Sequence, residues 1–184
     1  EQYMKKILTI AGLSLLLSFS ATTAQAQFSL GAAFEVRDEV PENGFGLRVE
    51  KGFLDQLPLL DFTLRAHFSY FNESNELSIN NINVSRDVDV YEYGLAAIAG
   101  VKLGLVKPYI GLGVGNQNFS FDADPDQFSF DESSFYWNGF GGAEISILPV
   151  LSPFIEYRIT RLTGTEDIDF DNVNRLAIGL KLNF

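Results

Sequence analysis

The chain has 184 residues, a formal net charge of −11 and no cysteine. This length suffices for one domain with its own core. The acidic balance excludes nucleic acid as a partner, because a polyanion binds proteins through Lys and Arg, and the lack of cysteine excludes a fold held by disulfides.

The amino-terminal segment has the pattern of a secretory signal peptide. Two lysines follow Met4, an apolar run covers residues 7–19, and Ala24-Gln25-Ala26 fits an A-x-A cleavage site. The apolar run is shorter than the roughly 20 residues that a membrane-spanning helix needs. We therefore expect residues 1–26 to be removed on export and residues 27–184 to form the folded domain. The three residues before Met4 do not belong to this pattern.

Alternation of apolar with small or polar side chains then predicts β-strands along the rest of the chain. In the strand at 137–147, Trp137, Ala143 and Ile145 are assigned to the apolar face, although glycines lie on both faces. The expected strands cover 28–37, 45–50, 62–70, 89–102, 109–116, 137–147, 155–160 and 175–184. Composition predicts polar loops over 72–86 and from 117 to about Ser134, and turns over 104–108 and 148–153.

These elements define an all-β fold, an eight-stranded antiparallel up-and-down barrel. The connections alternate in character along the chain. Those that contain Pro58, Pro108, or Pro149 and Pro153 are short, whereas the intervening ones are polar, mostly longer and acidic. Short periplasmic turns and longer external loops are typical of transmembrane β-barrels of the outer membrane.

Alternation alone does not decide which face of the barrel is the inside. A soluble periplasmic barrel of the lipocalin kind would use the same apolar row to enclose an apolar ligand. The charged row favours a membrane barrel instead, because it is rich in glycine, which suits a narrow interior, and contains acids together with bases. Aromatic residues also gather at the ends of the apolar rows, as in two interfacial girdles. They are Tyr70, Tyr91, Tyr93 and Trp137 towards the loops, and Phe28, Phe53 and Phe184 towards the turns.

Three segments carry a resemblance to a known family. They are the leader with its cleavage site, KPYIGLGVG at 107–115, and LAIGLKLNF at 176–184, an alternating strand that ends on Phe184. In these segments the chain resembles the small bacterial outer-membrane β-barrels of the OmpA, OmpX and OmpW type. The resemblance implies a barrel without a large pore among outer-membrane lipid and lipopolysaccharide, and recognition of Phe184 by the barrel assembly machinery. It implies no specific activity and no cofactor, and we expect a monomer.

On this interpretation the charged row lies in the lumen. The thirteen inward candidates are Glu35, Arg37, Arg48, Glu50, Arg65, His67, Glu92, Lys102, Glu144, Glu156, Arg158, Arg175 and Lys181. Removing one partner from a buried charge pair costs about 3–5 kcal/mol. Because eight strands leave room only for side chains, we expect a carboxylate–guanidinium network that fills the lumen and blocks large solutes. A small-ion leak through a rearranging network is the alternative.

The external loops contain acidic residues at a spacing of two. One cluster has Asp122, Asp124 and Asp126, followed by Asp131 and Glu132, and the other has Glu166, Asp167, Asp169 and Asp171. Calcium takes several carboxylate oxygens at once, so a divalent site or a cation bridge to lipopolysaccharide phosphate is one interpretation. A solvated acidic rim is the other. Phe119, Phe121, Phe128 and Phe130 flank the first cluster at even spacing, which predicts a projecting hairpin, either inert or open to edge pairing with a surface protein.

One enzymatic alternative arises from His67 and Ser69, which share a strand face. An H-x-S pair resembles the lipid A deacylase barrels, in which His and Ser act with a Glu as a nucleophile relay. The match is only two residues long, and the alternation directs both side chains into the lumen, away from lipid. We therefore expect no catalytic residues, and a structural or surface-interaction role in adhesion or envelope integrity through the acidic loops.

Overall fold

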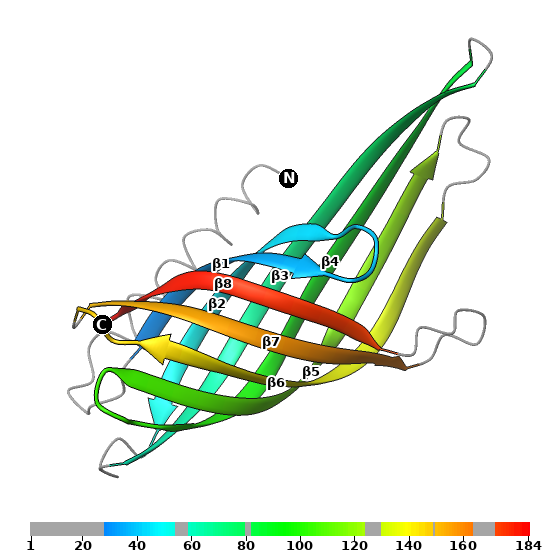
Figure 1. The fold of residues 1–184 in the computed structure, drawn as a ribbon. Helices are drawn as coiled ribbons and strands as arrows, with labels where there is room; N and C mark the ends of the chain where they lie inside the picture. Colours follow the sequence, from blue (N-terminus) through cyan, green and yellow to red (C-terminus); the bar gives the residue numbers. More distant parts are fainter. Residues whose placement is uncertain (1–27, 54–58, 80–81, 124–129, 149, 164–171) are drawn as a thin grey trace, which may run out of the picture.

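The protein is a closed antiparallel β-barrel in the computed structural model, which describes residues 28–53, 59–79, 82–123, 130–148, 150–163 and 172–184. The strands are β1 (Phe28–Arg37), β2 (Asn43–Phe53), β3 (Leu60–Ile79), β4 (Ile82–Val101), β5 (Val106–Ala123), β6 (Phe130–Ile145), β7 (Leu151–Thr163) and β8 (Val173–Asn183). They follow one another in chain order around the barrel (Figure 1). The expected signal peptide lies outside the described residues. Within those residues, no helix is long and apolar enough to span a membrane.

Pairing of β1 with β8 closes the barrel. Its register runs from Ser29 opposite Asn183 to Arg37 opposite Arg175. A closed ring leaves no unpaired edge in the wall. The predicted up-and-down barrel of eight strands is therefore confirmed.

The two ends of the barrel differ in their connections. Those from β2 to β3, β4 to β5 and β6 to β7 lie at one end, here called the turn end, and the other four lie at the hairpin end (Figure 1). In the β4–β5 turn, Leu103 bridges Val106 and Gly104 has a φ of 65°, which glycine adopts without strain. The turns expected over 104–108 and 148–153 are too long, because Pro108 and Pro153 lie in the first residues of β5 and β7, where a strand tolerates proline.

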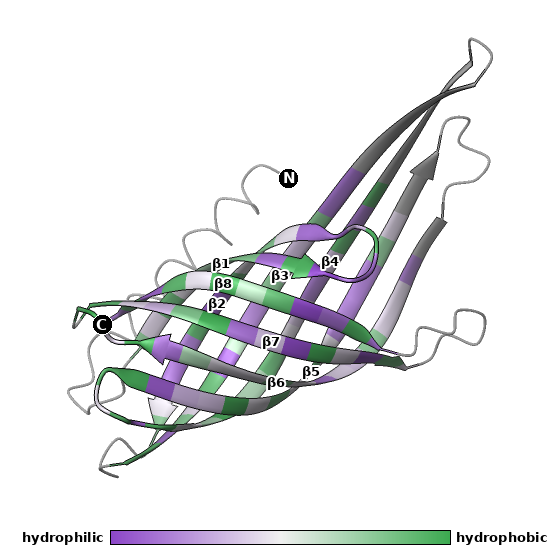
Figure 2. Cartoon of the chain, in the orientation of Figure 1, coloured by the Kyte–Doolittle hydropathy of each residue, from purple (hydrophilic) through white to green (hydrophobic). Residues whose placement is uncertain are grey.

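The two faces of the wall differ in burial. Ile110, Leu112 and Leu180 are 70%, 69% and 52% exposed, whereas Glu35 and Arg175 are 2% and 1% exposed. The same alternation appears as changes of hydropathy along each strand in Figure 2. The apolar row therefore faces outward and the charged row inward. This arrangement excludes the lipocalin-like alternative, which requires the reverse.

Strand β6 shows the same alternation despite its glycines. Tyr136, Asn138 and Glu144 are buried in the lumen, whereas Trp137 and Ile145 are exposed on the outer wall. The assignment of Trp137 to the apolar face is confirmed.

The loops expected over 72–86 and up to Ser134 are wrong for the described residues, because 72–79, 82–86, 117–123 and 130–134 continue the strands. Strands β3 and β4 stay paired as far as Ile79 opposite Ile82, and β5 and β6 as far as Phe121 opposite Phe130. Polar composition indicates exposure to water, but it does not prevent a ladder whose backbone groups satisfy one another across a hairpin. Strands β3 to β6 consequently project beyond the rest of the wall (Figure 1).

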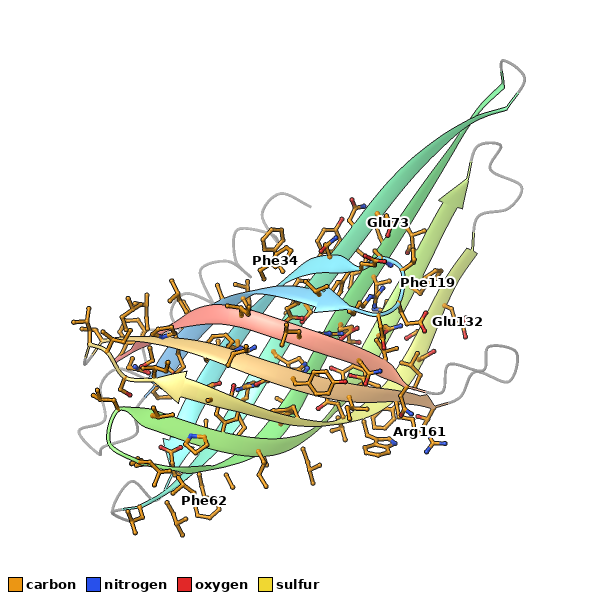
Figure 3. All side chains as sticks on the ribbon, in the orientation of Figure 1. Phe34, Phe62, Glu73, Phe119, Glu132 and Arg161 are labelled. Carbon is orange, nitrogen blue, oxygen red and sulfur yellow. The ribbon has the colours of Figure 1, made fainter. Side chains whose placement is uncertain are left out.

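Aromatic side chains line the outer wall near both ends. Tyr91, Tyr93 and Trp137 are exposed towards the hairpin end, and Phe53 and Phe184 towards the turn end. Figure 3 shows Phe34 and Phe62 on the outside of the barrel. Aromatic rings at two levels on an apolar wall are the girdles expected at the two surfaces of a bilayer.

Because the apolar row faces outward, a charged substitution is expected to lower the free energy of unfolding more in the middle of the outer wall than at its edge. Leu112→Arg, in mid-β5, is expected to lower the free energy of unfolding by about 2–4 kcal/mol, because hydrocarbon does not solvate a guanidinium. Leu105→Arg, in the β4–β5 turn, is the matched control and is expected to cost about 0–1 kcal/mol. Urea unfolding in phospholipid vesicles, followed by heat-modifiable electrophoresis, measures both. Equal costs would contradict a lipid-facing wall.

Candidate functional site

The structure places the charged row of every strand in the lumen. Twelve of the thirteen expected residues are buried: Glu35, Arg37, Arg48, Glu50, Arg65, His67, Glu92, Glu144, Glu156, Arg158, Arg175 and Lys181. The remaining one, Lys102, follows β4 at the turn end, and 37% of its side chain is exposed. Ion pairs divide these charges into two networks, one towards each end of the barrel.

The turn-end network is a chain in which cations and carboxylates alternate. It begins at the mouth of the barrel and reaches the middle of the lumen. In order, the pairs are Lys102–Asp61 (3.7 Å), Asp61–Lys107 (3.7 Å), Lys107–Glu144 (3.2 Å), Glu144–Lys181, Lys181–Glu50 (3.1 Å), Glu50–Arg65 (2.8 Å) and Arg65–Glu156 (2.6 Å). Each charge is thus held by neighbours of opposite sign, as burial requires.

Glu156 is the inner centre of this network. Besides Arg65, it pairs with Arg48 at 3.2 Å and with Arg158 at 2.8 Å. The hydroxyl of Tyr109 also donates a hydrogen bond to this carboxylate, at 2.9 Å. Four donors from three other strands and from β7 itself therefore converge on one buried carboxylate.

The hairpin-end network is centred on Arg175 of β8. Its guanidinium pairs with Glu35 at 3.0 Å and, with its other terminal nitrogen, with Glu92. Arg37 lies 3.6 Å from Glu92 and donates a hydrogen bond from Nε to the carbonyl of Pro41 at 2.5 Å. Side chains from β1, β4 and β8 are thereby joined across the lumen.

Aromatic rings that were not among the expected inward residues lie against the arginines. Distances from guanidinium carbon to ring centroid are 4.0 Å for Arg48–Phe154, 4.9 Å for Arg65–Phe140, 4.5 Å for Arg37–Phe71 and 4.6 Å for Arg175–Phe71. Ring faces attract cations and fill space without competing for the carboxylates. Parity was the signal available for all three: Phe71, Phe140 and Phe154 have the same parity as Arg65, Glu144 and Glu156 in their respective strands.

Two charged members of the turn-end network were also missed. Asp61 and Lys107 have the inward parity of their strands, but the expected strands began after each of them. Both lie within strands in the structure, where they extend the alternation of charge to the mouth.

The two ends of the lumen are closed differently. At the hairpin end, Phe71, Val88 and Val90 are 0–2% exposed and form an apolar layer beyond the arginines, with Pro41 also buried there. At the turn end, a cavity of about 590 Å³ opens to the outside and is lined by residues that include Ser29, Thr63, Lys102, Ser146 and Phe184. The lumen therefore has a buried apolar layer at the hairpin end and a polar mouth at the turn end.

The two residues behind the enzymatic alternative are engaged inside the barrel. His67 Nε2 lies 2.8 Å from the Tyr136 hydroxyl, and Arg175 donates a hydrogen bond to Ser69 Oγ at 3.4 Å. Gly94 makes room for this arrangement, because a Cβ there would lie 2.6 Å from the Tyr136 oxygen. With His67 and Ser69 7% and 1% exposed, neither reaches the lipid-facing wall.

The acidic residues proposed as cation ligands are not placed. Asp124, Asp126, Glu166, Asp167 and Asp169 lie outside the described residues, as does the side chain of Asp122. In the part of the chain that is described, no group of three or more His, Asp or Glu side chains is arranged to hold a metal ion. Phe184, the expected assembly signal, donates its backbone N–H to the carbonyl of Phe28 at 2.8 Å, and its ring is exposed.

A closed antiparallel barrel with an apolar outer wall, a charged interior and short turns at one end defines an outer-membrane β-barrel protein. The chain belongs to the outer membrane protein beta-barrel domain family, whose sequence profile matches residues 9–184. The turn end is accordingly the periplasmic end, and the hairpin end faces outward from the cell. No match was found among curated proteins.

Solved outer-membrane proteins share this fold at low sequence identity. A major outer membrane protein from Thermus thermophilus has a TM-score of 0.61 at 13% identity, with 88% of this chain and 100% of that chain covered. Ail, the attachment invasion locus protein of Yersinia pestis, in complex with the heparin analogue sucrose octasulfate, has a TM-score of 0.59 at 18% identity, with 88% and 100% covered. Neisserial surface protein A has a TM-score of 0.55 at 18% identity, with 88% and 98% covered. At such identities the likeness shows the fold alone.

Loss of a shared cation is expected to destabilise the barrel strongly. Arg65→Ala removes a partner from both Glu50 and Glu156, and is expected to lower the free energy of unfolding by about 3–5 kcal/mol, because it leaves buried charge uncompensated. Arg161→Ala is the control: this arginine lies on the outer surface (Figure 3) and its loss is expected to change stability by about 0.5 kcal/mol or less. Urea unfolding in vesicles compares the two. An Arg65→Ala barrel as stable as the Arg161→Ala barrel would show that the network does not hold the wall together.

Proposed function

We propose that this protein is a non-enzymatic outer-membrane barrel that acts at the cell surface through its projecting sheet, the part of β3 to β6 beyond the barrel wall. The barrel anchors this sheet in outer-membrane lipid and lipopolysaccharide as a monomer. The observation that carries the proposal is the unequal length of the strands at the hairpin end.

The lumen supports an anchoring role rather than transport. Its middle is occupied by the two ion-pair networks and by the rings that lie against their arginines. The apolar layer of Phe71, Val88 and Val90 covers the outer side. A solute would have to separate several buried ion pairs to pass, which leaves buried charges without their partners.

The projecting sheet has two edges with no partner strand among the described residues. Pairing of β2 with β3 ends at Gly44 opposite Phe71, whereas pairing of β3 with β4 continues to Ile79. On the other side, pairing of β6 with β7 ends at Phe135 opposite Thr163, whereas β6 continues to Phe130. An edge strand presents free backbone N–H and C=O groups, which extended segments of other proteins pair with by strand addition.

The negative charge of the hairpin end limits which molecules can bind the projecting sheet. The hairpin-end segments 122–132 and 166–171 are rich in Asp and Glu, so a sulfated polysaccharide such as the heparin analogue bound by Ail would be repelled here. A protein with an extended segment and basic flanks fits the combination of free edges and acidic rim. Divalent cations bridging the acidic rim to lipopolysaccharide phosphate would add attachment to the membrane surface.

Shortening the β3–β4 hairpin is expected to abolish surface adhesion without unfolding the barrel. Ser74 and Asp87 are opposite in the register, so replacing 75–86 with Asn-Gly joins them by a two-residue turn suited to a hairpin. Cells that express this variant should be retained at least tenfold less than wild-type cells on surfaces coated with collagen, fibronectin or laminin. Heat-modifiable migration confirms that the barrel has folded.

A substitution elsewhere at the hairpin end serves as the control. Glu42→Gln changes the charge of the exposed β1–β2 connection and leaves the projecting sheet intact, so adhesion should be unchanged. Equal retention of wild-type cells, cells with the shortened hairpin and cells that lack the protein, on every coating, would overturn the proposed surface role.

The non-enzymatic part of the proposal has its own test. Expression of the protein is expected to leave the acyl chains of lipid A unchanged in mass spectra, because His67 and Ser69 face the lumen. The Ser69→Ala variant should give the same spectra. Loss of an acyl chain on expression of the wild type, but not of Ser69→Ala, would show that the barrel is a deacylase.

A further inference from the structure

The alternation of charge along the lumen breaks at one place, between the two networks. Arg158 is an inner end of the turn-end network, and Arg175 is the centre of the hairpin-end network. These arginines are directly opposite each other in the register of β7 and β8. On the other side of Arg175, Arg37 is its register partner in β1. Like charges in opposed positions destabilise an antiparallel pair, and no ion pair between described residues joins the two networks.

The turn-end network also carries more cations than carboxylates. The cations are Lys102, Lys107, Lys181, Arg48, Arg65 and Arg158, and the carboxylates are Asp61, Glu50, Glu144 and Glu156. The hairpin-end network is balanced, with two cations and two carboxylates. At the mouth, water solvates the lysines. At the inner end water does not solvate the excess positive charge, because the three arginines that share Glu156 are only 2–3% exposed.

Unpartnered polar atoms gather beside this break. Arg158 has no partner for Nε and Nη1, and Arg175 has none for Nε. Neither the side-chain amide of Asn138 nor the hydroxyl of Thr160 has a partner, although each residue is only 1% exposed. Thr160 is opposite Asn138 in the register and two residues from Arg158 on the same face of β7. A buried donor without a partner costs about 1–3 kcal/mol, and more when it is charged.

We propose that these residues form a binding site for a small monovalent anion of the halide type, with chloride as the natural example. Arg158 supplies the charge and N–H groups from Nε and Nη1, and Asn138 and Thr160 supply an amide and a hydroxyl donor. The anion restores the alternation of sign between Arg158 and Arg175. It also offsets the excess positive charge around Glu156. This site goes beyond the surface role proposed above and does not depend on it.

The unpartnered polar groups indicate which chemical class of ligand can bind at this site. Most of the unpartnered groups are N–H or O–H donors, and the charged ones among them belong to the guanidinium groups of Arg158 and Arg175, so a cation would be repelled. A polyatomic anion such as phosphate is too large, because the interior of an eight-stranded barrel is only wide enough for side chains. A halide fits both restrictions.

Halide-dependent stability of the folded protein tests the site. Protein in zwitterionic detergent micelles is unfolded by heat in sodium chloride, sodium bromide or sodium gluconate at equal ionic strength. A ligand that binds only the folded state raises the midpoint saturably, by about 3–6 °C at a tenfold excess over its dissociation constant. Chloride and bromide are expected to raise the wild-type midpoint relative to gluconate.

Two matched variants separate the site from general effects of salt. Arg158→Gln should lose the halide dependence; in this variant Glu156 still has Arg48 and Arg65 as partners. Arg48→Gln removes a different partner of the same carboxylate and should retain the dependence. Heat-modifiable migration establishes that each variant is folded before the comparison.

Diffraction from wild-type crystals grown in sodium bromide provides a measurement that needs no variant. An anomalous peak within hydrogen-bond distance of Arg158, Asn138 and Thr160 is expected. Equal midpoints in chloride and gluconate for the wild type, an unchanged halide dependence in Arg158→Gln, or a lumen without an anomalous peak at saturating bromide would each overturn the proposal.

Discussion

Satisfaction of every backbone hydrogen bond in a layer without water is the constraint from which the rest of this structure follows. Hydrocarbon offers the peptide groups no partner, so strands that cross it must close into a ring. Here the closing contact is the pairing of β1 with β8, between Ser29–Arg37 at one end of the domain and Arg175–Asn183 at the other. Once the ring is closed, each strand has one face towards lipid and one towards a narrow interior, and successive side chains alternate between two environments.

The narrow interior then determines what the charged row does. Charges buried in the middle of the lumen are removed from water, so they pair with one another and lie against aromatic rings. Glu156 receives three guanidinium groups and a tyrosine hydroxyl, and Arg175 joins carboxylates from β1 and β4. The same crowding explains glycines such as Gly94, whose missing side chain leaves space for Tyr136. The middle of the interior is thus a core of ion pairs and aromatic rings.

Much of this architecture was predictable because alternation is a local signal. Side-chain parity predicted the strands and which side chains share a face, and the glycines, mixed charges and terminal aromatic residues of the two rows indicated that the charged face, with its twelve buried charged residues, is the inside. Prediction failed where composition and parity disagree. The Asn- and Ser-rich segment after Phe71 suggests a loop, yet it pairs along its length to Ile79, because an antiparallel ladder needs only backbone partners. Phe140 and Phe154 suggest the lipid face, yet their parity and the arginines place them inside.

By itself the sequence determined the strands of the barrel and which side chains share a face, since both depend on residues two apart along one strand. Only the tertiary structure decided which charges meet. Arg175 and Glu35 are 140 residues apart, and Arg48 and Glu156 are 108 apart, so their pairing depends on register and strand tilt around the whole ring. The same long-range geometry placed Arg158 opposite Arg175 with no ion pair between described residues that joins their two networks. No pattern along the chain encodes that break, because each of the two strands, read alone, contributes an ordinary inward arginine.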